Sequence, residues 1–79
     1  MDNVELRKRV MDIFADILRR ITDRYVMDEL TIPGSVLALK DEACGIAEKA
    51  AQERNADILG EYERRLIEIR ESVASSGKG

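Results

Sequence analysis

Apolar residues in the first thirty positions recur every three or four residues. A stripe with spacings of four, three and four is formed by Val10, Phe14, Ile17 and Ile21. This is the period of an α-helix and not the alternation of a strand. It predicts one long helix over residues 2–30. The stripe is broad, as expected for a helix with neighbours on more than one side. The residues that broaden it are Ile13, Leu18 and Tyr25.

A turn is predicted over residues 31–35, where the first helical pattern stops. Pro33, the only proline, lacks a backbone N–H and biases Ile32 away from helical dihedral angles. Gly34 can take a positive φ at little cost. Ser35 is suited to cap a following helix, because its hydroxyl can accept hydrogen bonds from the next backbone amides.

The second half of the chain carries two apolar stripes that are out of phase across residues 52–57. The first is rich in alanine, and the second runs from Ile58 to Val73 with larger side chains. Residues 50–54 are strong helix formers without Pro or Gly. One long helix over residues 36–73, bent where the phase changes, is therefore favoured. The alternative is a break near Asn55, which would cap a third helix beginning at Ala56.

The predicted fold class is all-α, with an antiparallel helical hairpin in a single domain over residues 1–74 and a flexible polar tail over 75–79. The stripes are too broad for one helical pair to cover, so we expect the hairpin to dimerise into a four-helix bundle. A three-helix bundle would cover them as well. The predicted interface residues are Val10, Ile13, Phe14, Ile17, Ile21, Leu59, Tyr62, Leu66 and Ile69.

Composition narrows the possible chemistry. The chain has 79 residues, no histidine and one cysteine, Cys44, which excludes a structural zinc site of the usual kind. Lys40 lies one helical turn before Cys44, but the chain has no histidine to activate the thiol, and an inert, packed thiol is expected. We predict no metal and no cofactor. A lone thiol fits a reducing compartment, and no apolar run approaches about 20 residues, so a cytoplasmic protein without a membrane partner is expected.

Charged residues make up 37% of the chain, and the net charge is −3. Opposite charges lie three and four residues apart, which is typical of ion pairs on a solvated helix face. The alternative is a groove on the first helix where Arg9, Arg20 and Arg24 meet phosphates or a partner's acids. Because no catalytic constellation is evident, the predicted function is a non-catalytic protein–protein interaction module. Its expected partners are a second copy and a larger protein.

The first helix resembles that of the all-helical chorismate mutases. The matching residues are Leu6-Arg7-Lys8-Arg9-Val10, Ile13, Ile17-Leu18, Ile21 and Arg24. The resemblance implies an enzyme in which Arg7 and Arg24 bind the substrate carboxylates and Glu42 meets the substrate hydroxyl. The chain departs from the family pattern at Ser35, where the family has a lysine, and at Asp41, where an arginine is expected.

Residues 18–46 also resemble the small subunit of exodeoxyribonuclease VII. Glu29-Leu30-Thr31-Ile32 and Ser35-Val36 match its turn and following helix start, whereas Pro33-Gly34 replaces acidic residues. This resemblance implies a non-catalytic subunit that packs on a larger nuclease. A nucleic-acid-associated helical dimer, similar to the Rop RNA-binding hairpins, is the related alternative.

Overall fold

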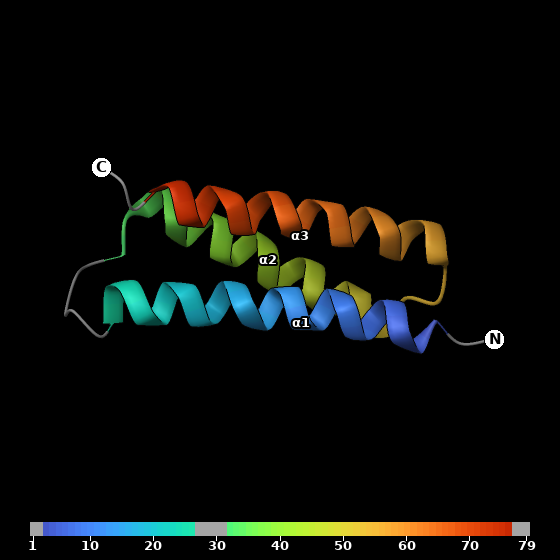
Figure 1. Ribbon diagram of the computed structural model, residues 1–79. Helices are drawn as coiled ribbons and strands as arrows, with labels where there is room; N and C mark the ends of the chain where they lie inside the picture. Colours follow the sequence, from blue (N-terminus) through green and yellow to red (C-terminus); the bar gives the residue numbers. More distant parts are fainter. Residues whose placement is uncertain (1–2, 27–31, 77–79) are drawn as a thin grey trace.

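The computed structural model describes residues 3–26 and 32–76, which form an up-down-up bundle of three helices (Figure 1). Helix α1 spans Val4–Ile21, α2 spans Gly34–Gln52 and α3 spans Ala56–Ser76. Each helix contacts the other two. No strand occurs among these residues, so the all-α prediction is confirmed.

The prediction of one continuous helix over residues 36–73 is wrong, because the chain leaves the helix at Glu53, where φ is −83° and ψ is 138°. The Glu53 carboxylate accepts hydrogen bonds from the backbone N–H groups of Arg54 (3.2 Å) and Asn55 (3.1 Å). The Asn55 side-chain oxygen then accepts from the N–H of Asp57 at 2.9 Å. Side chains therefore bond the backbone groups that a continuous helix would use. The alternative, a third helix from Ala56, is what the structure has.

The first helix is less regular than predicted. Its α-helical part begins at Val4 and ends at Ile21, and a π-helical turn, η1, continues it over Thr22–Val26. Residues 1–2 and 27–31 of the expected helix and turn lie outside the described residues. Asn3 occupies the N-cap position, but its amide does not cap α1. It donates instead to the Arg54 carbonyl at 2.6 Å, which ties the start of α1 to the α2–α3 connection.

The predicted turn residues divide between the connection and α2. Ile32 and Pro33 precede the helix, whereas Gly34 is its first residue. Pro33 holds the N-cap position with φ −58° and ψ 147°, and its carbonyl accepts from the Leu37 N–H at 2.9 Å. The prediction that Ser35 caps this helix is wrong, because the helix starts before Ser35.

The core runs along the bundle axis and draws on all three helices. On α2 the buried residues are mostly small, with Ala43, Ala47 and Ala50 beside Val36, so α2 brings its backbone close to the larger side chains of its neighbours. The largest fully buried side chains are Ile17, Leu59, Leu66, Ile69, Val10, Val36 and Val73. The helix α3 includes Ser75 and Ser76, which the sequence assigned to the polar tail; residues 77–79 of that predicted tail lie outside the described range.

Replacing the residue that caps α3 should destabilise the bundle. Asn55→Ala removes the acceptor for the Asp57 N–H, and we expect a loss of about 1 kcal/mol in the free energy of unfolding. Urea denaturation followed by circular dichroism measures this loss. The control is Gln52→Ala, an exposed position at the end of α2, which should stay within about 0.5 kcal/mol of the parent. Equal effects of the two substitutions would contradict the capping role.

Candidate interaction surface

The residues predicted to form a dimer interface lie in the core of a single chain. Val10, Ile17, Leu59, Leu66 and Ile69 are 0% exposed, and Ile21 is 3% exposed. Ile13, Phe14 and Tyr62 are partly buried and pack against this core. The third helix therefore covers the broad stripe of α1, and a second copy is not needed to bury it.

Charged side chains join α3 to both other helices. Arg9 of α1 pairs with Glu63 at 3.1 Å, and Asp16 of α1 lies 3.7 Å from Arg70. These pairs identify the flank of α1 that faces α3. In the same way, Glu42 of α2 receives two hydrogen bonds from Arg65, through Nε and, at 2.8 Å, through Nη2. This bidentate pair identifies the flank of α2 that faces α3.

The carboxylates of Asp16 and Glu42 accept hydrogen bonds from arginine side chains. Asp16 accepts from Arg20 Nε at 3.0 Å and from Arg19 Nη2 at 2.6 Å, and these bonds lower the pKa of its carboxyl group below the usual value. The hydrogen bonds from Arg65 likewise lower the pKa of Glu42. Both groups stay ionised at neutral pH and act as fixed partners of arginine.

The opposite flanks of α1 and α2 carry apolar side chains. Met11 follows Arg9 by two residues, and Leu18 follows Asp16 by two. A two-residue step turns an α-helix by about 200°, so Met11 and Leu18 lie across the core stripe from the flank that faces α3. Val4, seven residues before Met11, continues the same stripe.

The same geometry applies to α2. Cys44 follows Glu42 by two residues and therefore lies on the flank away from α3. Leu37 lies seven residues earlier, on the same stripe. We call the surface formed by the two stripes the α1–α2 face; it consists of Val4, Met11, Leu18, Leu37 and Cys44.

The α1–α2 face is partly open to solvent. Val4 is 56% exposed and Leu37 is 43% exposed, and these are the exposed large apolar side chains among the described residues. Met11, Leu18 and Cys44 are half-buried. The ion pairs recorded in the described part of the chain lie within one helix or join α3 to a neighbour. The α1–α2 face is thus the side of the bundle on which apolar groups reach the surface.

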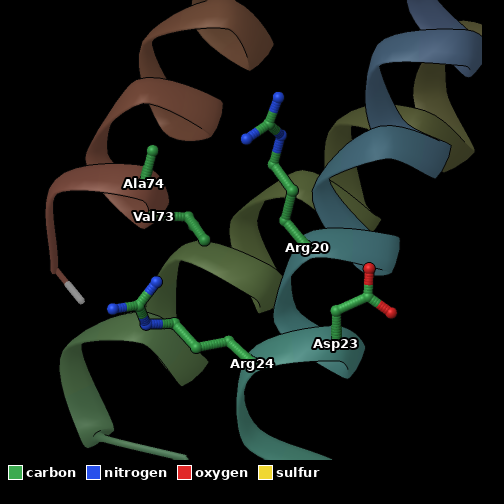
Figure 2. Close-up of a pocket in the computed structure, with 5 residues that line it drawn as sticks. All are labelled: Arg20, Asp23, Arg24, Val73 and Ala74. Carbon is green, nitrogen blue, oxygen red and sulfur yellow. The ribbon is translucent and has the colours of Figure 1, made fainter.

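An open groove of about 590 Å³ lies between the ends of α1 and α3, lined by Arg20, Asp23, Arg24, Val73 and Ala74. Figure 2 shows the two arginine side chains on either side of Val73, whereas the Asp23 carboxylate points away from them. Of the three arginines predicted to share a groove, Arg20 and Arg24 do so. Arg9 lies elsewhere and pairs with Glu63.

The residues implied by the chorismate mutase resemblance do not meet within one chain. Seventeen residues separate Arg7 from Arg24, which is about 25 Å along a helix axis. Glu42 is held by Arg65. A dicarboxylate bound between these three groups has no site in a single copy.

No group of three or more cysteine or acidic side chains in the described ranges is arranged to hold a metal ion. Within those ranges, no helix is long and apolar enough to cross a membrane. No protein-family model, curated protein or solved structure matches the chain. The two family resemblances of the sequence therefore stay predictions that rest on short stretches.

The α1–α2 face left a signal in the sequence that the prediction did not use. Val4, Met11 and Leu18 recur every seven residues beside the main stripe of α1. From spacing alone, Leu18 belongs to one broad stripe, and Val4 and Met11 have no assigned face. The spacing does not show which part of the stripe α3 covers. The position of α3 in the structure is needed to identify the apolar residues that stay at the surface.

The ion pairs of Asp16 predict a stability that depends on pH. The folded-state pKa of the Asp16 carboxyl is lowered. The stability that the ionised carboxylate contributes is therefore present above the ordinary pKa and is lost as the pH falls through the folded-state pKa. Asp16→Asn should therefore lower the midpoint of urea unfolding at about pH 7 and change it little near about pH 2.

The control for this prediction is Asp12→Asn, an exposed position one turn earlier on α1. It should change the midpoint little at either pH. An Asp16→Asn loss of equal size at both pH values would show that the side chain acts by packing and not by charge.

Proposed function

We propose that the protein is a small, non-catalytic helical interaction module that docks through the α1–α2 face. In this role it serves as an adaptor, regulator or accessory subunit of a larger complex. The observation that carries the proposal is that both exposed large apolar side chains of the described residues, Val4 and Leu37, belong to this face. Exposed apolar groups gathered on one side of a small domain favour a binding surface.

The rest of the molecule supports a binding role over a catalytic one. The buried core is filled by aliphatic side chains and Tyr25, and the described ionisable groups with shifted pKa values are partners in ion pairs. Such pairs perturb pKa values without serving chemistry. The proposal needs no cofactor.

A cytoplasmic location is part of the same proposal, supported by the single thiol of Cys44. The net charge of −3 favours a protein partner over nucleic acid. Arg20 and Arg24 do share a groove, but Asp16 already holds the Nε of Arg20. Binding of an anionic group in this groove is therefore less favoured than docking through the α1–α2 face.

A photo-crosslinking residue tests which face binds a partner. We expect p-benzoylphenylalanine in place of Leu37, in cells that naturally make the protein, to give a light-dependent adduct of defined mass. The control places the same residue at Arg64, an exposed position of α3. Arg64 lies seven residues after the exposed Asp57 and therefore on the same side of α3. It lies two residues before the buried Leu66, a turn of about 200° around the helix, so its side chain points away from the core.

The comparison of the two positions decides the outcome. A strong adduct at position 37 and a weak one at position 64 agrees with the proposed function. Equal adducts, or none at position 37, would reject docking through the α1–α2 face.

A further inference from the structure

The three helices contribute unequally to the core. Among the largest fully buried side chains of the described residues, α2 supplies Val36, whereas α3 supplies Leu59, Leu66, Ile69 and Val73. The other buried positions of α2 are alanines, and its Leu39 and Ile46 are only partly buried. A buried alanine methyl removes much less apolar surface from water than a buried Leu or Ile side chain. Burial therefore stabilises the position of α2 less than that of α3.

The most extensive contact between two helices is that of α1 with α3. These helices run parallel to each other (Figure 1). Arg9 of α1 pairs with Glu63 of α3 at 3.1 Å. Seven residues further along both helices, Asp16 lies 3.7 Å from Arg70. The two helices thus keep one register over two turns, through contacts in which α2 takes no part.

The polar contacts of α2 with α3 lie at the surface. Glu42 of α2 pairs with Arg65 of α3, and both side chains are more than 40% exposed. The Arg54 carbonyl, just beyond α2, accepts its hydrogen bond from Asn3 at an exposed site. Exposed ion pairs and hydrogen bonds of this kind contribute little to stability, because water replaces them when they open.

The helix α3 also begins independently of α2. The backbone of Glu53 is extended, with ψ at 138°, so the helical hydrogen bonds of α2 end there. The side-chain oxygen of Asn55 accepts from the N–H groups of Asp57 at 2.9 Å and Ile58 at 3.4 Å. This cap belongs to α3 alone. Unfolding of α2 therefore leaves the first turn of α3 with its own hydrogen bonds.

We infer that α2 opens as a separate unit while α1 and α3 stay packed against each other. In this open state α2 is unfolded, and the apolar sides of α1 and α3 that it covered face water. Proteins open locally at the elements that bury few large apolar groups and whose polar contacts are exposed. Among the three helices, α2 is the one that meets both conditions.

Opening of α2 also changes the surface of the bundle. The α1–α2 face exists only while α2 is closed, since Leu37 and Cys44 leave α1 when α2 opens. A partner that binds this face would bind the closed state alone and suppress opening. The opening itself does not depend on the docking role proposed above, and it is measured on the protein without a partner.

Hydrogen exchange of the backbone amides, followed by NMR on the full chain, tests the inference. After correction for intrinsic rates, the central amides of α2 should exchange at least about tenfold faster than those of α1 and α3. The reason is that α1 and α3 exchange only when the whole bundle unfolds, whereas α2 exchanges from the open state as well.

Two glycines provide matched substitutions. Gly45 lies within α2 and Gly60 within α3, and both are half-buried. A methyl group added at either position meets no other side chain or distant backbone atom within 4 Å. Alanine should therefore stabilise each helix through helix propensity alone, which slows exchange about fourfold to fivefold wherever that helix must unfold.

The two variants have different expected patterns. Gly60→Ala should slow exchange in α1 and α3 by this factor and leave α2 unchanged, because α3 is still folded when α2 opens. Gly45→Ala should slow exchange in all three helices, because α2 is unfolded both in the open state and in the unfolded chain.

The inference is overturned if Gly60→Ala changes exchange in α2 as much as in α3, since the bundle then unfolds as one unit. Equal exchange of the three helices in the parent protein overturns it as well.

Discussion

Burial of the apolar side of α3 against α1 and α2 is the interaction on which the structure depends. Leu59, Leu66, Ile69 and Val73 are at most 2% exposed and close the core from one side. Burying one such side chain contributes about 1.5–3 kcal/mol. A domain of this size has a total stability of only about 5–15 kcal/mol. Without α3, the broad stripe of α1 would face water.

The helices and their buried stripes could be predicted from the sequence, because a period of 3.6 residues is visible wherever one side of a helix is covered. Val10, Ile17, Leu66 and Ile69, which the sequence predicts at an interface between two copies, are buried within a single chain. The pattern did not reveal whether a third helix of the same chain or a second copy covers these residues. A broad stripe has the same appearance whether a third helix or a second copy lies on it.

The ends of α2 were predicted wrongly because local interactions of single side chains outweigh helix propensity there. Residues 50–54 favour a helix, yet Glu53 and Asn55 bind backbone N–H groups and end it. At the start of α2, Ser35 has the better capping side chain, but Pro33 occupies the N-cap position and the helix begins at Gly34. Propensities of about 0.5 kcal/mol per residue are too small to settle such choices.

The position of α3 also defines which surface is left for function. The charged residues of α1 and α2 that face α3 form ion pairs with it, as Arg9 does with Glu63 and Glu42 with Arg65. From the sequence alone, these charged residues could not be distinguished from residues that only contact water. The opposite side keeps the apolar side chains of Val4 and Leu37 at the surface. That division is the basis of the proposed docking role of the α1–α2 face.

The distance between the start of α2 and the end of α3 tests the central claim most directly. Spin labels on Ser35→Cys and Ser75→Cys, in a Cys44→Ala background diluted with unlabelled protein, report this distance by pulsed electron paramagnetic resonance. The bundle predicts a distance of about 20 Å, because α3 folds back beside α2 at the spacing of packed helices. A distance of about 60 Å, the length of one continuous helix between the labels, would contradict the account.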